Sequence, residues 1–532
     1  MTISAGLIIL EGAKMGIDRR TFIKGSALFG GAAVAGGLFG CSPGGQNTSN
    51  GQGGTSTANV GSNGSEYASR VTETRDVDVL VVGEGISGLS AGVTAAEAGL
   101  KTTIIDTIQT LERRGPEGIF GVGSTLQKNQ GIAIDPADII ARETLFFNYR
   151  LDALTWKDMI GASGANIDWL AEKGVEFTGQ VDNYRNMGEF ECFHWFPGDH
   201  VAWQYYSTPM EKAFLGYGNT EVLLETTAVE LIMDGNVVVG AYATSPSGII
   251  QFNTKAIIFA TGGCGGSKEE IAKRFQTLPL GRYYCDGYPT NDGSGLNMAL
   301  AAGGVDVTTA RCMLAHIDGW AKVSDLNRLA QPMNGIWVNQ NGERFTDESI
   351  NTRFAGAAMN AMMAQYNSHS VMDAEIVQAN DTRQDGLLDI AIKDAADGDP
   401  EFFSADTIEG LAAKIKVDAA TLKATVDEYN ALCDAGVDSV FKKDARFLMK
   451  IQTPPFFAGH QFVNAHGMVG GLLVNRNFQV LRWDNTPIAG LYAVGTESNM
   501  NYRETYTIEV PGTDFGNCVY SGRRAAQHIA KQ

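Results

Sequence analysis

Residues 77–92 read VDVLVVGEGISGLSAG, and this stretch decides the fold. A short apolar strand runs into the pattern GxGxxG, and an alanine-rich segment that reads as a helix follows to about Ala98. A second apolar strand, 102–105, ends at Asp106, where an acidic side chain can accept hydrogen bonds from ribose hydroxyls. Strand, helix, second strand and acidic end together predict the βαβ unit of a dinucleotide-binding fold.

The glycines of this loop have separate physical roles. Gly83 allows a tight turn, Gly85 lets a pyrophosphate approach the backbone, and Gly88 lets helix and strand pack closely. Ile86 and Ser87 lie in the first helical turn, where unpaired N–H groups and the helix dipole favour an anion. The motif alone does not distinguish FAD from NAD.

The acidic balance of the chain limits its partners. Its 532 residues carry a formal net charge of -19, which disfavours nucleic acid or an anionic bilayer because both would repel the protein. The chain is longer than a single hydrophobic core usually requires, which predicts two interlocked domains plus a tail.

The cysteine spacing gives no sign of a metal centre. No cysteine pair has the spacing of a c-type haem, an iron–sulfur cluster or a zinc finger, so the sequence predicts no metal centre.

The first 41 residues read as an export signal. Arg19 and Arg20 precede an apolar run, 27–39, that is shorter than the ~20 residues of a membrane span, a pattern typical of twin-arginine signals. The run leads into a lipoprotein-like box at Cys41. We expect a lipid anchor there, on the outer face of the cytoplasmic membrane, or a leader cut elsewhere with Cys41 discarded. We assign residues 42–75 to a flexible linker, because 42–65 is nearly all Gly, Ser, Asn, Gln and Thr.

Later segments repeat the motif of a strand that ends at a glycine turn. Residues 222–263 read as strands with a turn at 234–236, and the last strand ends in ATGG. Residues 290–299 read as a turn that feeds a helix, and 490–497 as a strand running into a glycine turn, with a helix from Gly512 to Ile529 behind it. Widely separated pieces of this kind suit one extended cofactor.

From about Asp76 to Gln532, the chain resembles the flavoprotein subunits of fumarate reductases and soluble flavocytochrome c. This family includes urocanate-, cinnamate- and ketosteroid-type reductases or dehydrogenases. The resemblance rests on the order of the segments GEGISGLSAG, ATGG, TNDGSG, NGERF with a later TR, GLYAVG and GTDFGNCVYSGR. It implies an α/β fold: a glutathione-reductase-type FAD-binding Rossmann domain in two parts, 76–310 and 463–532, with an inserted α+β capping domain, 311–462.

The resemblance also implies FAD as the cofactor, and we expect it to be bound non-covalently because no covalent-attachment motif is apparent in the sequence. It places the adenine end near Asp106, the flavin near Gly123, Ser124 and the helix after Gly512, and Asp292 close to the pyrophosphate or ribityl chain. Two departures are visible: Thr496 stands where the family usually has Glu, and 115–124 is not the usual Gly-Gly-Asn segment. The predicted cofactor residues are Gly83, Gly85, Ile86, Ser87, Gly88, Asp106, Thr107, Gly123, Ser124, Val229, Ala260, Thr261, Gly262, Asp292, Gly495, Thr496, Glu497, Thr513, Asp514 and Phe515.

The stretch 342–353 resembles the one that ends in the family's catalytic arginine. The resemblance assigns Arg353 the proton and flavin N5 the hydride in the reduction of a carbon–carbon double bond. Arginine is normally always charged, so it would be re-protonated through an acidic neighbour such as Asp347 or Glu348. An ordinary ion pair within the cap is the alternative role for Arg353.

The family's substrate clamp is only partly matched. His316 and His466 lie near its carboxylate-binding histidines, His466 within one residue of the expected register. Its second clamp arginine falls on Glu509, and its cap Thr-Glu pair falls near Asn327 and Arg328. Arg503 and Arg328 are candidates to replace the missing charge, and fumarate becomes a doubtful substrate.

An aromatic run, 190–196, with Trp203, Tyr205 and Tyr206 behind it, lies where the family places residues near the flavin. Core packing is the ordinary explanation of such a run. A wall for a substrate that bears a ring is the functional one, and it favours an unsaturated monoacid or enone over fumarate.

The leading hypothesis is an exported reductase of an α,β-unsaturated carboxylate or enone, with electrons from a separate cytochrome or quinol-linked partner. The first alternative is a ketosteroid-type flavin dehydrogenase that introduces a double bond, with Tyr502 or Tyr506 as the base. The second is a non-catalytic flavin-binding lipoprotein.

Overall fold

The computed structural model describes residues 65–532 with internal gaps. The gaps are 111–116, 185–187, 199–202, 275–282, 286–288, 309–314, 319–325, 327–328, 330–331, 353–360, 363, 366, 382–383, 385, 466–469, 499, 503–505 and 507–508. The predicted export signal, Cys41, Arg328, Arg353, His466 and Arg503 lie outside the described residues.

A large sheet unites strands from both ends of the described sequence. Its order is β17-β18-β8-β9-β1-β2-β6, with β7 paired to β8. Strands β18, β9, β1, β2 and β6 run parallel, and β7, β8 and β9 form an antiparallel meander. Their bounds are β1 (Val71–Val82), β2 (Thr102–Ile105), β6 (Thr220–Leu223), β7 (Thr227–Asp234), β8 (Val237–Ser245), β9 (Gly248–Phe259), β17 (Gln479–Leu481) and β18 (Pro487–Ala493).

Strand β1 is buried on both faces toward its C-terminal end. Val79 and Val81 belong to one apolar core, while Leu80 and Val82 belong to the core on the other face. A continuous apolar run is typical of a parallel strand with both faces covered. The strand begins at Val71, so residues 71–75, which we assigned to the linker, belong to it instead. The sequence did not indicate this because Thr72 and Thr74 are exposed and the other three residues are only partly buried.

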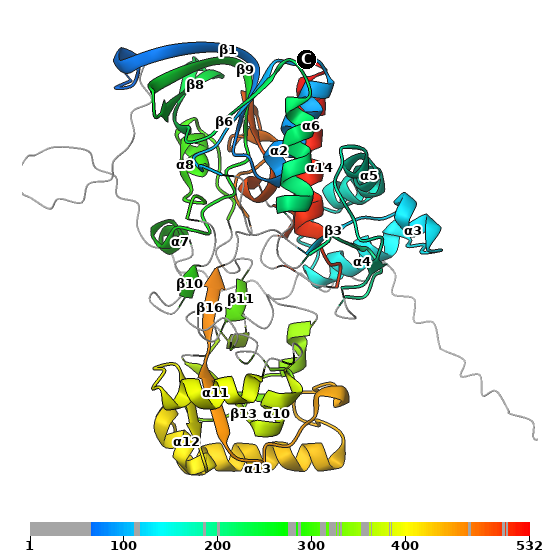
Figure 1. Ribbon diagram of the computed structural model, residues 1–532, viewed down its shortest axis with the longest axis vertical. Helices are drawn as coiled ribbons and strands as arrows, with labels where there is room; N and C mark the ends of the chain where they lie inside the picture. The colour runs from blue at the N-terminus through cyan, green and yellow to red at the C-terminus, as the bar shows by residue number, and fades with distance from the viewer. Residues whose placement is uncertain are drawn as a thin grey trace, which may run out of the picture. The chain divides into compact units, whose positions relative to one another are not determined.

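Helices cover the sheet, and Figure 1 shows α2, α6 and α14 side by side. A Cβ at Gly522 of α14 would lie 2.3 Å from the Ser87 carbonyl oxygen of α2, so the two backbones meet at this glycine. The helices of this part are α2 (Ile86–Glu97), α3 (Thr125–Asn129), α4 (Pro136–Phe146), α5 (Ala153–Glu172), α6 (Thr208–Leu215), α7 (Lys268–Arg274), α8 (Ser294–Ala301) and α14 (Thr513–Ile529).

Two small sheets lie outside the central one. The first has the order β3-β5-β4, and the second has the order β10-β16-β11. Their strands are β3 (Gly118–Phe120), β4 (Val181–Asp182), β5 (Phe193–Trp195), β10 (Tyr283–Cys285), β11 (Ala315–Asp318) and β16 (Phe462–Ala465).

The inserted segment is α+β, as the resemblance implied. A sheet of order β12-β13-β15-β14 packs with helices on a separate apolar core that includes Val338, Val371 and Leu411. Side chains cap several of these helices; Asp418, for example, accepts from the Thr421 N–H at 2.8 Å, an N-cap bond worth ~1 kcal/mol. The elements are β12 (Ile336–Asn339), β13 (Ser368–Asp373), β14 (Phe402–Ala405), β15 (Phe456–His460), α10 (Ala374–Ala379), α11 (Leu387–Ala396), α12 (Ile408–Ile415) and α13 (Ala419–Ala435).

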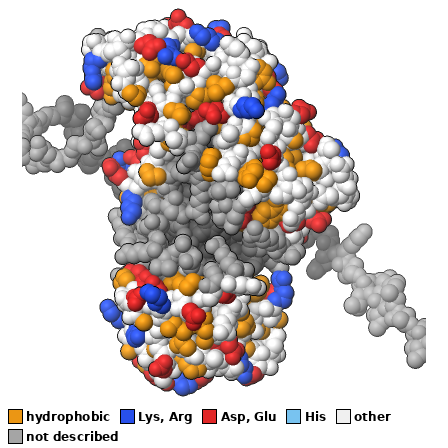
Figure 2. All heavy atoms as spheres, viewed as in Figure 1, with side chains coloured by type: hydrophobic (Ala, Val, Ile, Leu, Met, Phe, Trp, Pro, Cys, Tyr) orange, Lys and Arg blue, Asp and Glu red, His pale blue; other side chains and the backbone are white. Residues whose placement is uncertain are grey.

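The surface carries mixed charge. On the face drawn in Figure 2, acidic and basic side chains are interspersed, and exposed apolar side chains are scattered. Within the described part of the chain, no helix combines the length and apolar character needed to cross a membrane.

Candidate functional site

The loop after β1 has room only for glycine at two of its positions. Gly83 has φ +107°, and a Cβ there would lie 2.4 Å from the Ala260 carbonyl oxygen. A Cβ at Gly88 would lie 1.9 Å from the Gly83 carbonyl oxygen. Gly85 is the N-cap of α2 with an ordinary φ of -70°. The loop therefore holds the start of α2 close to the ends of β1 and β9.

Two helices near this loop begin without a side-chain cap. Helices α2 and α14 start after Gly85 and Gly512, and neither N-cap makes a side-chain hydrogen bond. Helices α6, α8 and α11 also begin without a side-chain cap, whereas α3, α4 and α5 are capped by Ser124, Asp135 and Asp152. An uncapped N-terminus leaves backbone N–H groups and partial positive charge for an anionic or polar ligand.

Asp106 lies at the end of β2, beside the glycine loop. Its carboxylate accepts from the Glu84 N–H at 2.6 Å and from the Ile108 N–H at 3.1 Å. These bonds fix the carboxylate next to the predicted pyrophosphate site. The Thr227 hydroxyl donates to the Thr107 hydroxyl at 2.8 Å, which ties the start of β7 to this edge. Val229, another predicted cofactor residue, is a half-buried residue of β7.

Glu497 joins two of the predicted cofactor segments. Its Oε2 accepts from the Thr261 hydroxyl at 2.5 Å and from the Gly263 N–H at 2.9 Å. Burial raises the pKa of Glu497, and its Oε1 has no hydrogen-bond partner among the described residues. A Cβ at Gly495 would lie 2.7 Å from the Ser87 hydroxyl, so this turn also contacts α2.

Other predicted cofactor residues lie on the same strand ends and helix starts. Gly262 has φ +81°, and a Cβ there would lie 2.8 Å from the Asn291 side-chain oxygen. The exposed Asp292 carboxylate accepts from the Ser294 N–H at the start of α8 at 2.9 Å. Ala260 is buried where β9 ends, and Thr496 is half-buried after β18.

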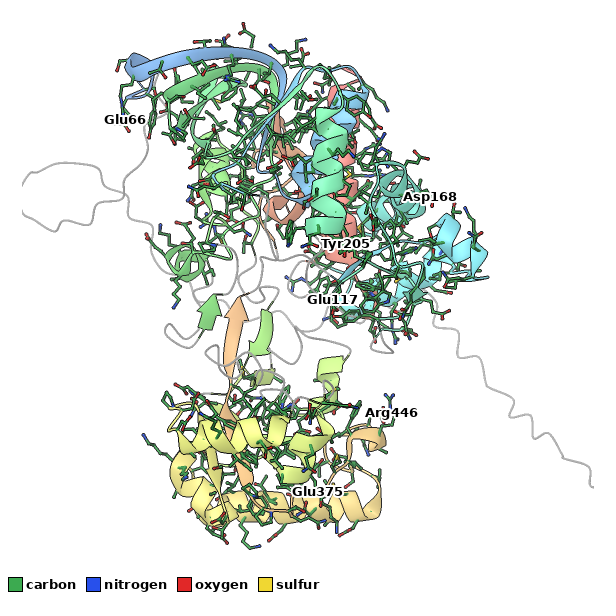
Figure 3. All side chains as sticks on the ribbon, viewed as in Figure 1. Glu66, Glu117, Asp168, Tyr205, Glu375 and Arg446 are labelled. Atoms are coloured by element: carbon green, nitrogen blue, oxygen red, sulfur yellow. The ribbon has the colours of Figure 1, made fainter. Side chains whose placement is uncertain are left out.

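Each backbone N–H of the loop 121–124 donates a hydrogen bond to another group of the protein. The Gly121 N–H donates to the Cys192 carbonyl, the Val122 N–H to Ser163, and the Gly123 and Ser124 N–H groups to the Gln127 side chain. Asp168, labelled in Figure 3, accepts from both the N–H and the hydroxyl of Thr125. Space is open above Gly123, where a Cβ would meet nothing within 4 Å. Any cofactor contact here therefore uses the loop's surface rather than its N–H groups.

The Ser124 hydroxyl makes its hydrogen bonds within the protein. Its hydroxyl lies 2.7 Å from Nε2 of His194 and accepts from the Gln127 N–H at 3.1 Å. Burial lowers the pKa of His194 to about 4, so the imidazole is neutral at pH 7. Ser124 therefore shapes the loop, and its predicted cofactor role stays a prediction. The sequence missed His194 as its partner because 70 residues separate the two.

Hydroxyl groups gather at the start of α14. The Tyr502 hydroxyl and the Thr513 hydroxyl are buried without a hydrogen-bond partner among the described residues. The rings of Tyr502 and Tyr506 make an edge contact with centroids 5.1 Å apart. Burial, followed by the charge of Asp514, raises the pKa of both tyrosines. Because a raised pKa keeps the hydroxyl protonated, neither Tyr502 nor Tyr506 is well suited to act as a base.

An acidic and basic cluster, which the sequence did not predict, joins α4 to the segment before α14. Arg142 Nε lies 2.8 Å from Glu509, and Arg142 Nη2 lies 2.7 Å from Glu189. Beside this pair, Glu143 is fully buried, and neither of its oxygens has a hydrogen-bond partner among the described residues. Burial, then the charge of Glu509, raises the pKa of Glu143 well above its usual range.

The predicted catalytic residues are only partly described. His316 lies on β11, where its backbone pairs with Asn464 of β16, two residues before His466. This pairing brings the two predicted histidine segments together. Tyr506 is half-buried beside the core. Arg353, His466 and Arg503 lie outside the described residues.

Asp347 and Glu348, the two acids proposed to re-protonate Arg353, both make hydrogen bonds to other residues. Glu348 is fully buried and accepts from Arg344 at 2.8 and 2.7 Å, with Lys443 3.3 Å away. The Asp347 carboxylate accepts from both the N–H and the hydroxyl of Ser349. Glu348 therefore joins Arg344 and Lys443 inside the inserted segment, whereas Asp347 makes a local turn with Ser349, and a role of either acid beside Arg353 stays a prediction.

The aromatic run is mainly core. Phe193, Trp195, Phe196 and Tyr206 are all buried. The Phe515 ring makes edge contacts with Phe196 and Tyr206, with centroids 5.5 and 5.0 Å apart. The Tyr206 hydroxyl also bonds to α2, at 2.9 Å from the Ile86 carbonyl. These rings fasten β5 and α2 to α14, so the ordinary explanation of core packing holds for them.

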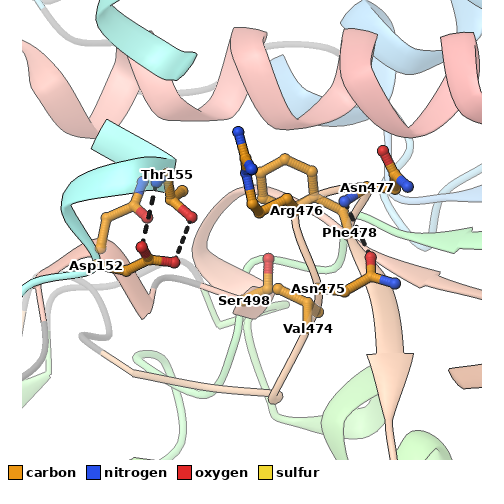
Figure 4. Close-up of a pocket in the computed structure, with 9 residues that line it drawn as sticks. Asp152, Thr155, Val474, Asn475, Arg476, Asn477, Phe478 and Ser498 are labelled. Atoms are coloured by element: carbon orange, nitrogen blue, oxygen red, sulfur yellow. Dashed lines mark hydrogen bonds between the residues drawn. The ribbon is translucent and has the colours of Figure 1, made fainter. Parts of the chain in front are cut away.

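A pocket of about 410 Å³ lies at another place, where α5 begins near the segment 474–478 (Figure 4). It is lined by Asp152, Thr155, Arg476, Ser498 and Asn501, among others. Arg476 is paired with Asp158 at 2.9 Å, so its charge is already matched. None of the predicted site residues lines this pocket. Over the described residues, His, Cys, Asp and Glu form no group suited to a metal ion.

The described residues fit FAD. The uncapped N-terminus of α2 suits a pyrophosphate, and Asp106 lies at the neighbouring strand end. Glu497 Oε1 and the Thr513 hydroxyl are buried polar atoms that a bound polar ligand would satisfy. The uncapped start of α14 and the open space above Gly123 would suit the flavin end of the cofactor.

Comparison with known proteins shows which family the chain resembles. The sequence profile described as FAD binding domain matches residues 78–508. The chain is 30% identical to a vinyl phenol reductase of Lactiplantibacillus plantarum, over 85% of this chain and 96% of that protein. It is 26% identical to a urocanate reductase of Eggerthella lenta, over 80% of this chain and 70% of that protein.

Solved structures show the same fold. The open conformation of a flavocytochrome c3 fumarate reductase matches with a TM-score of 0.67 and 23% identity, over 87% of this chain and 79% of that chain. A 3-ketosteroid-Δ4-(5α)-dehydrogenase from Rhodococcus jostii RHA1 matches with a TM-score of 0.69 and 20% identity, over 87% and 99%. The predicted fold and cofactor are confirmed.

Proposed function

Because the chain belongs to the FAD binding domain family of flavoproteins and is an FAD-dependent reductase of carbon–carbon double bonds, we propose that its substrate is an aryl-conjugated alkene with at most one negative charge. The observation that carries this proposal is the Arg142–Glu509 ion pair. Glu509 is 3% exposed and is committed to Arg142, so this position offers no free positive charge to a second carboxylate. The similarity to a vinyl phenol reductase supports a ring on the alkene.

The chain's own residues set the conditions for the reaction. FAD, when bound, supplies the hydride. The protein orients the cofactor through the glycine loop, Asp106 and the start of α14, and Arg353 delivers the proton to the other alkene carbon. The raised pKa of Tyr506 keeps its hydroxyl protonated, which suits reduction rather than the dehydrogenation that would need a tyrosine base.

The cell-envelope setting is a further part of the proposal. The paired arginines 19 and 20 support export by the twin-arginine route, and Cys41 supports a lipid anchor on the outer face of the cytoplasmic membrane. A separate cytochrome or a quinol-linked membrane partner would supply electrons. Similarity to a cytochrome-type fumarate reductase of Shewanella frigidimarina, 23% identical over 86% of this chain, supports a cytochrome donor.

An anaerobic competition experiment tests the substrate. The reduced protein is mixed with 4-vinylphenol, an arylacrylate or fumarate, and flavin reoxidation is followed by absorbance. We expect the two aryl alkenes to reoxidise the flavin faster than fumarate. A clear preference for fumarate would refute the proposal and would mean that Arg503 or Arg328 restores the clamp.

A further inference from the structure

Tyr184, a residue outside the aromatic run, packs on two rings of that run. It follows β4 and is half-buried, whereas Phe193 and Trp195 of β5 are buried. The Tyr184 ring is stacked on Trp195 with centroids 5.6 Å apart and 17° between the planes, and it is tilted against Phe193 at 4.8 Å. In this stack of three rings, two buried rings support a third that remains partly accessible.

The backbone of Tyr184 has an unusual conformation that the protein holds in place. Its φ is +59°, in the left-handed region that a tyrosine rarely adopts. Such a conformation persists only where the surroundings fix it, and it is frequent at functional sites. Asp182 Oδ1 accepts from the Tyr184 N–H at 2.8 Å and from the Trp195 indole N–H at 2.9 Å. One carboxylate therefore orients both of the stacked residues.

The hydroxyl end of the Tyr184 ring is also fixed. It donates to Glu117, labelled in Figure 3, at 2.8 Å. Glu117 precedes β3, in which Gly118 pairs with Trp195. The ring is thus held at its backbone and at its hydroxyl. A side chain that is already ordered loses little conformational freedom when a ligand packs on it, so it suits a binding site.

Contacts lead from this stack to the segments on which the substrate site depends. A Cβ at Gly512, which precedes α14, would lie 2.8 Å from the Phe193 ring. The Phe120 N–H donates to the Gly512 carbonyl at 3.1 Å. Later in the connection between β4 and β5, the Glu189 N–H donates to the Glu509 carbonyl at 2.9 Å. The stack therefore touches the start of α14, and its own loop is bonded to the segment that carries Glu509.

We propose that Tyr184 is a specificity-determining residue of the alkene-reducing site: its ring, supported by Trp195 and Phe193, contacts the aryl ring of the substrate. Rings in offset or edge contact gain affinity beyond the burial of their area, which an alkene without a ring cannot use. The inference rests on the proposed function of aryl-alkene reduction and adds the residue that recognises the ring.

The test measures binding without turnover. The oxidised holoenzyme, which cannot reduce an alkene, is titrated with 4-vinylphenol in a calorimeter. Tyr184→Leu keeps an apolar side chain but removes the ring, and we expect it to raise the Kd by about threefold to tenfold. Tyr184→Phe keeps the ring and loses only the bond to Glu117, so its Kd should stay within about twofold of wild type.

The matched control is Tyr217→Leu. Tyr217 is also a half-buried tyrosine whose hydroxyl donates to a glutamate, Glu97, at 3.4 Å. This variant should bind 4-vinylphenol as wild type does. An equal loss of affinity in Tyr217→Leu and Tyr184→Leu would overturn the proposal, because the effect would then not depend on the position of the ring.

Tyr184→Gly removes the ring in a second way. Glycine adopts a positive φ without strain, so this variant decides the point if Tyr184→Leu does not fold. Unchanged affinity in a folded variant without the ring would overturn the proposal, as would a wild-type enzyme that does not bind 4-vinylphenol. A wild-type enzyme that binds 4-vinylphenol, but whose reduced flavin is reoxidised by fumarate in preference, would instead refute the proposed function, which separates the two failures.

Discussion

The hydroxyl oxygen of Ser124 lies 2.7 Å from Nε2 of His194, and both side chains are fully buried. His194 Nδ1 lies 3.2 Å from the Cys192 carbonyl, which can only accept, so Nδ1 carries the proton and Nε2 accepts from Ser124. The pair fixes the loop on which the flavin is expected to rest. It works only while the imidazole is neutral.

The first prediction is a loss of stability in mild acid. The pKa of His194 is about 4 in the folded protein, against ~6.5 in the unfolded chain. The unfolded state therefore binds more protons between these values, and stability falls as pH decreases from ~6.5 toward 4. Between pH 7 and pH 5, His194 should contribute a loss of roughly 2 kcal/mol, measured by denaturant unfolding. His194→Gln should show a shallower pH dependence, and identical slopes would contradict the argument.

The second prediction concerns the contact of α2 with α14. Gly522→Ala would push a methyl group against the Ser87 carbonyl and should lower the free energy of unfolding by about 1–3 kcal/mol. Gly161→Ala is the matched control, because Gly161 also lies within a helix but has nothing within 4 Å of its Cβ position. That variant should be neutral or up to ~1 kcal/mol more stable. Equal effects in thermal unfolding would show that the helices are not in close contact.

The third prediction is that the flavin is released by acid. We expect a yellow protein whose colour passes into the supernatant on acid precipitation, because no covalent attachment motif is visible in the sequence. Absorbance of pellet and supernatant decides the point. Colour retained in the pellet would mean a covalent bond.

The fourth prediction assigns the proton donor. Arg353→Gln should abolish alkene reduction and leave the flavin spectrum and FAD content unchanged. The control is Arg446→Gln, an exposed arginine of the inserted segment that pairs with Asp444 and is labelled in Figure 3. Turnover of Arg353→Gln above about a tenth of wild type would rule out the assignment.

The fifth prediction concerns specificity. Glu509→Gln removes the buried partner of Arg142 and should raise the ratio of kcat/KM for fumarate over 4-vinylphenol by roughly tenfold, which corresponds to ~1.4 kcal/mol. Glu189→Gln removes only the exposed partner and should change this ratio much less. If the two variants shift the ratio equally, the buried charge pair does not determine specificity.

Local patterns in the sequence predicted the fold well. The glycine loop, the strand before ATGG, the strand that includes GLYA, and the helix after Gly512 all depend on turn chemistry that neighbouring residues encode. The pairs that shape the site are different, because they join distant positions. Arg142 and Glu509 are 367 residues apart, and Ser124 and His194 are 70 apart. A glutamate such as Glu143, on a helix with charged neighbours, looks like a surface residue until the packing around it is known.

The role of the aromatic run 190–196 also could not be decided from the sequence alone. Rings bury large apolar areas in a core as well as in a ligand site, so Phe193 and Phe196 look alike under both interpretations until their neighbours are known. Phe515, which the resemblance placed at the cofactor, is one of those neighbours.

Helices α2 and α14, which begin beside the predicted cofactor site without side-chain caps, make the stability of the fold depend on bound FAD. Without the cofactor, the starts of α2 and α14 and the unsatisfied Glu497 and Thr513 atoms raise the free energy of the native state. Ligand binding to the native state alone adds stability that grows with the free ligand concentration. The lifetime of this protein in the cell should therefore follow the flavin supply, and proteases should remove chains that fail to acquire it.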